Sequence, residues 1–385
     1  MELSKKVSSI QPSATIELNS KALELQNKGK KVTRLTAGEP DFDTPTPIVE
    51  AAYTAMKEGK TKYTDSKGIK ELRSKIAEYI NQKYMCEYDY NNVLVTNGGK
   101  QALFNVLLLL INPGDEIILF DPSWVSYEAQ IKMVGGTPIH VKTFSKDNYV
   151  PNTKELETAI TNKTKAIILN SPNNPTGAIY DKNFLSYISK LSIEKDIIII
   201  SDEVYDTLVY DDEYISMVMF KESIKNTILV NSFSKSWSMT GWRVGYTIAS
   251  KELISQMAKI QSHSTSNVNT PSQYAALKAL DIDNSYMVKE FKKRRDYLFE
   301  EFSKLGLKFI KPKGAFYYFL DISDFGLSDK EFCDKLLNYG LAVVPGSAFY
   351  YDGYIRLSFA ASMEDLKNAV EILKTFIDDL EKKTI

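Results

Sequence analysis

A short stretch of the chain combines an amine, two hydroxyls and a guanidinium between two apolar runs. Ser232, Ser234 and Lys235 come first, and Arg243 follows after Met239-Thr240-Gly241-Trp242. A lysine amine can form an imine with a carbonyl group, while hydroxyls and a fixed cation can hold a phosphate. The set therefore suits a cofactor that carries both an aldehyde and a phosphate. Because a lone lysine is usually a solvated surface charge, this interpretation depends on partners elsewhere in the chain.

Three segments upstream supply such partners. They are residues 35–42 (LTAGEPDF), 171–177 (SPNNPTG) and 201–205 (SDEVY). With Lys235 and Arg243 in the same order, the chain resembles the class I aminotransferases of the aspartate aminotransferase family, which use pyridoxal 5′-phosphate (PLP). The resemblance extends from about residue 10 to the C-terminus. It implies an α/β fold, that of the fold type I PLP-dependent transferases.

The composition favours a globular enzyme and excludes several other classes. A hydrophobic content of 43% with a formal net charge of −1 predicts no nucleic-acid or membrane surface. The first residues lack the apolar core of a signal peptide. Cys86 and Cys333 suggest neither a disulfide framework nor a metal site, so we expect a cytoplasmic protein without a metal. We interpret the two histidines, His140 and His263, as incidental.

Short apolar runs alternate with segments whose apolar residues recur every three or four positions. The runs predict buried parallel strands and lie at 93–95, 117–120, 166–169, 197–200 and 228–230. Segments such as 184–193 predict helices between them. This alternation implies a wound sheet covered on both faces, and the resemblance implies a mostly parallel sheet of seven strands.

At 385 residues the chain exceeds one ordinary core, so two domains are expected. From about residue 285 the pattern changes to long charged helices and short strands. We therefore expect a large PLP-binding domain at 46–285 and a smaller α/β domain at 286–385. By the resemblance alone, the N-terminal arm 1–45 joins the smaller domain.

A phosphate cradle is expected where residues 97–101 (NGGKQ) follow one strand and open a helix. Free backbone N–H groups at a helix start, with glycine allowing close approach, can bind a phosphate; an ordinary strand-to-helix turn is the alternative. The cofactor ligands predicted at this end are Gly99, Lys100, Gln101, Ser232, Ser234 and Arg243. A structural ion pair is the alternative for Arg243. By the resemblance, Tyr63 reaches the phosphate from the partner subunit of a homodimer.

Asp202 directly follows the run at 197–200, at the carboxyl end of an expected strand, where open α/β sheets place their ligands. A buried carboxylate there would keep the pyridine nitrogen of PLP protonated, so that the cofactor can act as an electron sink. A helix cap is the alternative. By the resemblance, Tyr205 and Asn174 hydrogen-bond the phenolic oxygen of PLP, and Trp124 stacks on its ring; core packing is the alternative for Trp124.

Arg356 is a charge inside an otherwise apolar strand-like run at 354–359. Burying it without a partner would be costly, so we infer a carboxylate partner. A planar, bidentate guanidinium suits the α-carboxylate of an amino acid. The resemblance gives Arg356 that role and adds Gly38, Trp124 and Asn174 to the substrate contacts.

The distal carboxylate of the substrate needs a second cation, and residues 262–267 contain no arginine that could supply it from a partner chain. In one bacterial branch of the family, a lysine in Gly-Gly-Lys-Gln and a serine in Pro-Ser-Ala-Thr bind this carboxylate. Lys100 and Ser13 match them. The resemblance therefore implies aspartate and glutamate as substrates, with prephenate in some members. A solvent-facing lysine is the alternative for Lys100.

Together these residues predict an aspartate aminotransferase with Lys235, Asp202 and Tyr205 as catalytic residues. The incoming amino acid would release Lys235 from its imine, and the free amine would then shuttle the α-proton as base and acid. The amino group of L-aspartate would pass to 2-oxoglutarate by a ping-pong mechanism. An aminotransferase for aromatic or other neutral amino acids, and a PLP-dependent C–S lyase on the same scaffold, remain alternatives.

Overall fold

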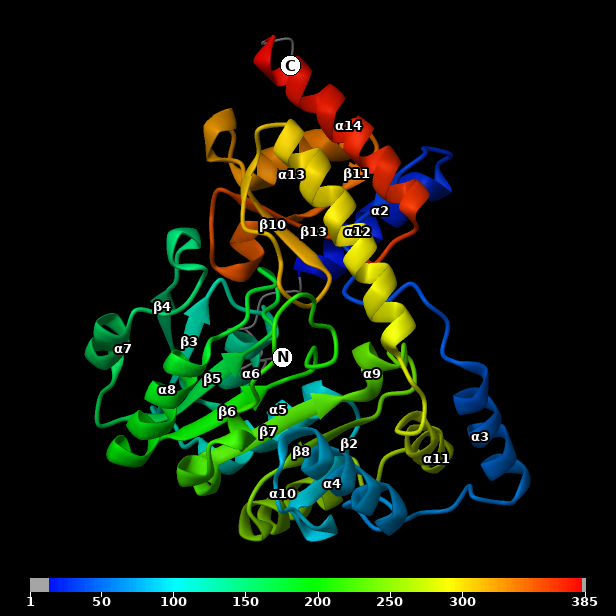
Figure 1. Cartoon of the computed structure of the whole chain (residues 1–385), viewed down its shortest axis with the longest axis vertical. Helices are drawn as coiled ribbons and strands as arrows, with labels where there is room; N and C mark the ends of the chain where they lie inside the picture. The colour runs from blue at the N-terminus through cyan, green and yellow to red at the C-terminus, as the bar shows by residue number, and fades with distance from the viewer. Residues whose placement is uncertain (1–13, 383–385) are drawn as a thin grey trace, which may run out of the picture.

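The computed structural model describes residues 14–382 and shows two packed regions, one above the other in Figure 1. The lower region contains a seven-stranded sheet in the order β2-β8-β7-β6-β5-β3-β4. Its strands are β2 (Val93–Thr96), β3 (Glu116–Asp121), β4 (Thr137–Lys142), β5 (Thr164–Asn170), β6 (Ile198–Asp202), β7 (Thr227–Ser232) and β8 (Gly245–Ile248). β8 is antiparallel to both neighbours, and the other pairs are parallel. The predicted α/β class with a mostly parallel sheet is confirmed.

Both faces of this sheet are buried, which explains why its strands are apolar at successive positions. In β3, Ile117 and Leu119 pack under one layer of helices, α5 (Gly99–Leu110), α6 (Ser126–Val134) and α10 (Lys251–Ser264). Ile118 and Phe120 pack on the other face, under α7 (Thr153–Ala159) and α8 (Lys182–Lys195). Successive side chains of a strand point to opposite faces, so burial on both sides requires an apolar residue at every position.

The helix layer that contains α7 and α8 continues over the other half of the sheet. There α4 (Lys70–Tyr84) and α11 (Thr270–Ala279) cover apolar side chains of β2, β7 and β8. α3 (Thr46–Lys57) packs beside α11 at the edge of the molecule (Figure 1). It buries Ile48 and Ala52 but leaves Val49, Tyr53 and Met56 exposed.

The upper region is formed by the C-terminal part of the chain. Its antiparallel sheet has the order β12-β13-β10-β9 and consists of β9 (Lys308–Phe309), β10 (Tyr317–Asp321), β12 (Val344–Pro345) and β13 (Tyr354–Ser358). The helices α12 (Ser285–Lys304), α13 (Asp329–Asn338) and α14 (Met363–Glu381) pack around it. Although α12 is rich in charge, Phe291, Leu298 and Phe302 lie on its buried face, which gives the region its own apolar core.

The N-terminal segment lies against this upper region. β1 (Thr33–Arg34) pairs in parallel with β11 (Leu341–Ala342). Ala22, in α2 (Ala14–Asn27), and Val32 pack with Leu337 and Ala342. From these contacts we propose 46–285 as the large domain and 286–385 with the segment before residue 46 as the small one.

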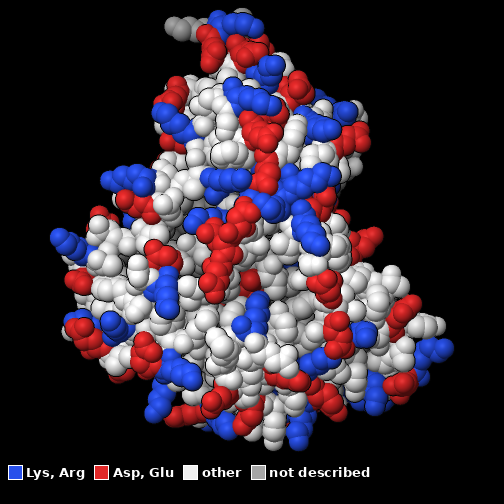
Figure 2. All heavy atoms as spheres, viewed as in Figure 1, with Lys and Arg blue, Asp and Glu red and all other residues white. Residues whose placement is uncertain are grey.

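The surface carries no dominant charge. Lys and Arg side chains are interspersed with Asp and Glu side chains over the face shown in Figure 2, in keeping with the formal net charge of −1. Within residues 14–382, no helix combines the length and apolarity that a membrane crossing requires.

Candidate active site

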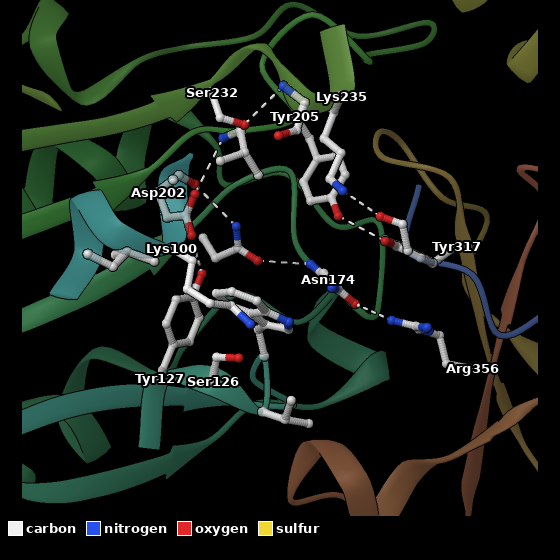
Figure 3. Close-up of a pocket in the computed structure, with 18 of the residues that line it drawn as sticks. Lys100, Ser126, Tyr127, Asn174, Asp202, Tyr205, Ser232, Lys235, Tyr317 and Arg356 are labelled. Atoms are coloured by element: carbon white, nitrogen blue, oxygen red, sulfur yellow. Dashed lines mark hydrogen bonds between the residues drawn. The ribbon is translucent and has the colours of Figure 1, made fainter. Parts of the chain in front are cut away.

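A cavity of about 310 Å³ lies where the carboxyl ends of β5, β6 and β7 face the C-terminal region. Figure 3 shows side chains from both regions converging on it. Most of the residues predicted from the sequence line this cavity: Gly38, Gly99, Lys100, Trp124, Asn174, Asp202, Tyr205, Ser232, Ser234, Lys235, Arg243 and Arg356. Segments more than 300 residues apart in the sequence therefore meet at one place.

Lys235 lies in α9 (Phe233–Ser236), the single turn that follows β7. Its Nζ atom donates a hydrogen bond to the carbonyl of Gly38 (Figure 3). Burial lowers the pKa of Lys235 to about 8; the charges of Arg243 and Arg356 act in the same direction, while Glu39 opposes them. A buried amine with a lowered pKa is available near neutral pH as a nucleophile and as a base.

Asp202 is the last residue of β6, and its carboxylate is buried. Tyr127 donates a hydrogen bond to Oδ2 at 2.6 Å, and the N–H of Val204 donates to Oδ1 at 3.4 Å. Burial nevertheless raises the pKa of Asp202 to about 6. A cationic ligand beside this carboxylate would compensate for the cost of burying its charge.

Arg356 lies in β13 with only 2% of its surface exposed. Its Nη1 donates to Oδ1 of Asn174 at 3.0 Å and its Nη2 to the carbonyl of Thr36 at 2.8 Å, and its guanidinium lies 4.5 Å from the ring centroid of Tyr317. Within residues 14–382 it forms no ion pair, and its buried Nε has no hydrogen-bond partner there. A buried cation of this kind favours an anionic ligand.

At another side of the cavity, several groups that bind anions lie together. Ser232 caps α9 by accepting a hydrogen bond from the N–H of Ser234 at 3.2 Å. The guanidinium of Arg243 lies close to Gly98: a Cβ atom added to Gly98 would be 2.6 Å from Nη2 of Arg243. The N–H groups at the start of α5 have no carbonyl acceptor within the helix. Together these groups suit a phosphate.

A family model for class I and II aminotransferases matches residues 30–373. The chain belongs to this family. The aspartate aminotransferase of Thermotoga maritima is 48% identical to it over 98% of this chain and 99% of that protein. The aspartate/prephenate aminotransferase of Thermus thermophilus is 42% identical over 96% and 97% of the two chains. The structure of the Thermus thermophilus aspartate aminotransferase with maleate superposes with a TM-score of 0.94 at 41% identity, covering 97% and 99% of the two chains.

PLP is the cofactor of this aminotransferase, and the cavity fits it. Among residues 14–382, four cationic side chains line the cavity, those of Lys100, Lys235, Arg243 and Arg356, against the one carboxylate of Asp202. Such a balance suits a ligand that carries a phosphate at one end and brings an anionic substrate to the other. The raised pKa of Asp202 further indicates a place for a protonated ring nitrogen.

Two predicted site residues of the aminotransferase, Gln101 and Tyr63, do not line the cavity. The side chain of Gln101 accepts a hydrogen bond from the N–H of Asn97 at 2.6 Å and donates to Thr265 at 2.5 Å, so it closes the loop before α5. Tyr63 is 90% exposed and lies outside the lining of the cavity. Ser13 lies outside the described residues.

Three further residues of the cavity were missed in the sequence. Tyr127 bonds Asp202, and the hydroxyl of Tyr317 lies 2.9 Å from that of Tyr205. Asn170 accepts a hydrogen bond from the N–H of Asn174 and donates one to the carbonyl of Asp202. A polar residue at the end of an apolar strand was the available signal for Asn170. Neither tyrosine has a comparable signal, because its partner is distant in the sequence.

The raised pKa of Asp202 predicts how the stability of the cofactor-free aminotransferase depends on pH. Between pH 4 and pH 6 the carboxyl ionises in the unfolded chain but stays protonated in the fold, so the free energy of unfolding should fall as pH rises. Asp202→Asn should remove about 2–3 kcal/mol of this fall. Urea unfolding of both proteins at several pH values measures it, and parallel curves would contradict the expectation. Glu203→Gln provides a comparison. Burial raises the pKa of Glu203 to about 7, so this variant should lose a part of the fall that extends to about pH 7.

Proposed function

We propose that this aminotransferase moves the amino group of L-aspartate to 2-oxoglutarate. The observation that carries the proposal is Arg356, a buried guanidinium without an acidic partner among the described residues, in the same cavity as the amine of Lys235. A guanidinium binds the α-carboxylate of an amino acid through two parallel hydrogen bonds. The names of the Thermotoga and Thermus relatives support aspartate as the donor.

The residues that would hold PLP follow from the same geometry. Ser232, Ser234, Arg243 and the start of α5 would bind its phosphate, and Asp202 its ring nitrogen. Tyr205 and Asn174 would hydrogen-bond its phenolic oxygen, and Trp124 would pack on its ring. When bound, PLP supplies an electron sink that stabilises negative charge at the substrate α-carbon.

Lys235 would move the proton in this reaction. Its lowered pKa leaves part of the amine unprotonated just above neutral pH, so it can accept the proton from the α-carbon and return it on the other side of the transfer. The hydrogen bond to the carbonyl of Gly38 orients the amine. Arg356 and Asn174 meanwhile fix the carboxylate, which limits the motion of the α-carbon relative to Lys235.

A mixture of aspartate and 2-oxoglutarate tests the proposal. Glutamate and oxaloacetate should appear in equal amounts, and initial rates should give the parallel lines of a ping-pong mechanism. Free ammonia without glutamate would indicate a lyase instead. Glutamate, phenylalanine and alanine as donors, and prephenate as acceptor, would define the substrate range in the same assay.

Lys100 is proposed to bind the distal carboxylate of aspartate. It lines the cavity, and its Nζ atom lies 5.0 Å from the ring centroid of Trp124. Burial lowers the pKa of Lys100, and the positive charge of Arg243 lowers it further. Lys100→Ala should raise the KM for aspartate about tenfold and that for phenylalanine less than about twofold. The exposed Lys195→Ala serves as the control. An equal rise for both substrates would contradict this role.

We also propose a homodimer in which Tyr63 completes the cavity of the partner. Tyr63 and three side chains of α3, Val49, Tyr53 and Met56, are exposed, and such a set of apolar and aromatic groups suits an interface. Tyr63→Phe should raise the Kd for PLP about tenfold, because a phenol donor to a phosphate is lost. Light scattering and PLP titration measure both properties. A monomer, or an unchanged Kd, would contradict this proposal.

The proposed location is the cytoplasm. Cys86 and Cys333 form no disulfide, and burial raises the pKa of both thiols. Unpaired cysteines are typical of a reducing compartment.

A further inference from the structure

A polar cluster outside the cavity surrounds His140, which lies in the edge strand β4. Its Nδ1 atom is 2.8 Å from Oδ2 of Asp121, and its Nε2 atom is 3.1 Å from Oε2 of Glu128. The ring centroid of Tyr350 lies 4.8 Å from that of the imidazole. The four residues come from β3, β4, α6 and the end of the loop at residues 346–351, so the cluster joins the large sheet to the C-terminal region.

The surroundings of His140 favour its charged form. Glu128 also binds Lys132 and Tyr350, and these groups hold the pKa of Glu128 below its ordinary value although burial opposes them. Burial lowers the pKa of His140, but the hydrogen bonds and charges of Asp121 and Glu128 outweigh it and raise the pKa. α7 packs against the opposite face of β4, with Val141, so its charged residues do not face the imidazole. Only a charged imidazole can donate to both carboxylates.

Asp121 connects His140 to the cavity by a short path. Its Oδ1 accepts a hydrogen bond from the hydroxyl of Ser123 at 2.8 Å. The N–H of Ser123 donates to the carbonyl of Phe349 at 3.1 Å, and the ring centroid of Phe349 lies 5.0 Å from the guanidinium of Arg356. Ser123 directly precedes Trp124, which lines the cavity. The path therefore reaches both the segment that carries Trp124 and the loop that supports Arg356.

A second path leads from Asp121 to the same loop. The carbonyl of Asp121 accepts hydrogen bonds from the N–H of Thr143 at 2.8 Å and from its hydroxyl at 2.7 Å. The carbonyl of Thr143 in turn accepts one from the hydroxyl of Tyr351 at 3.0 Å. The loop at 346–351 is thus attached to the large sheet through Phe349, Tyr350 and Tyr351, and Asp121 or Glu128 takes part in each attachment.

We propose that His140 is a positioning residue for substrate binding: by bridging Asp121 and Glu128, it holds the loop at 346–351, and with it Arg356, against the segment that carries Trp124. The inference rests on the proposed function, because it assigns the carboxylate to Arg356. Loss of the bridge should displace the carboxylate site while Lys235 and Asp202 keep their places, so binding should suffer more than the chemical step.

The test compares His140→Ala with His140→Asn in the PLP-loaded enzyme. In His140→Ala, the KM for aspartate and the Kd for maleate, a dicarboxylate that does not react, should rise about tenfold, while kcat stays within about twofold. Asparagine can place an amide N–H near the position of Nδ1 and donate to Asp121, so His140→Asn should restore most of the affinity. The absorbance of bound PLP and the Tm show whether each variant is folded.

The charge on the imidazole provides a second readout. As pH rises through the pKa of His140, the wild-type enzyme loses the doubly bonded bridge, so its advantage in maleate affinity over His140→Asn should shrink. Proton NMR of the imidazole groups gives this pKa directly, because the chain has two histidines. His263→Gln identifies which signal belongs to His140.

Two outcomes would overturn the inference. One is a His140→Ala enzyme that binds maleate as tightly as the wild type. The other is a loss of affinity that follows the Tm in every variant and that asparagine does not restore, since this marks a purely structural histidine. A wild-type enzyme that binds no dicarboxylate would instead contradict the proposed function, so the two failures are distinguishable.

Discussion

Replacing Lys235 with alanine should lower kcat for transamination between aspartate and 2-oxoglutarate by at least about 1,000-fold. The amine is buried at the end of β7, its pKa is lowered to about 8, and it is oriented by the carbonyl of Gly38. A methyl group can neither bond the cofactor nor carry a proton. Product formation followed by a coupled assay measures the loss.

The competing amine in the same cavity is Lys100, which makes a chemical control possible. Borohydride reduction of the holoenzyme should attach PLP permanently to the peptide that contains Lys235, in the wild type and equally in Lys100→Ala. The Lys235→Ala protein should carry no such label. A label on the Lys100 peptide, or a Lys235→Ala enzyme with more than a few per cent of the wild-type rate, would contradict the assignment.

The second large effect is expected at Arg356. Arg356→Lys should raise the KM for aspartate and the Kd for maleate by about 100-fold, with a much smaller change in kcat. Lysine keeps the charge but cannot form two parallel hydrogen bonds to a carboxylate, and its single ammonium group cannot reproduce the fork that donates both to the side-chain oxygen of Asn174 and to the carbonyl of Thr36. Steady-state kinetics and maleate titration measure the change.

Arg295→Lys provides the matched control. Arg295 is also buried in the C-terminal region, but it pairs with Asp211 and Asp296 and does not line the cavity. The control should lower the Tm without changing the affinity for maleate. If both substitutions weakened maleate binding to a similar extent, the effect at Arg356 would be one of stability, and its proposed contact with the carboxylate would be wrong.

The strands predicted from the sequence are those buried on both faces, because burial alone demands a continuous apolar run. β4 was missed because, as the edge strand, it includes Pro138 and His140 and stays partly exposed. β8 follows Arg243 and was recognised as an apolar run, but it was not counted among the strands of the sheet, although it is buried throughout. It begins at Gly245, where a Cβ would lie 2.6 Å from the backbone of Gly98 and Gly99. This close approach requires a glycine, which interrupts the apolar pattern.

The candidate site was predictable where one local segment carries several of its groups, as around Lys235 or Asp202. Tyr127 and Tyr317 were not, because each acts through a hydrogen bond to a residue far away in the sequence. His140 was interpreted as incidental for the same reason: its carboxylate partners lie on β3 and α6, and only the packed structure brings them to its two ring nitrogens. Pairings of this kind are set by tertiary contacts and have no local pattern.

Two cationic side chains of the cavity are anchored by the peptide backbone of one segment: the carbonyl of Thr36 accepts from Arg356, and that of Gly38 accepts from Lys235. Every amino acid brings the same carbonyl, so alanine scanning along this segment would leave both anchors in place and underestimate its contribution. An ester in place of the amide linkage, which weakens the carbonyl as an acceptor, would expose it. Mutational maps of such enzymes can therefore overlook a segment that orients both Lys235 and Arg356.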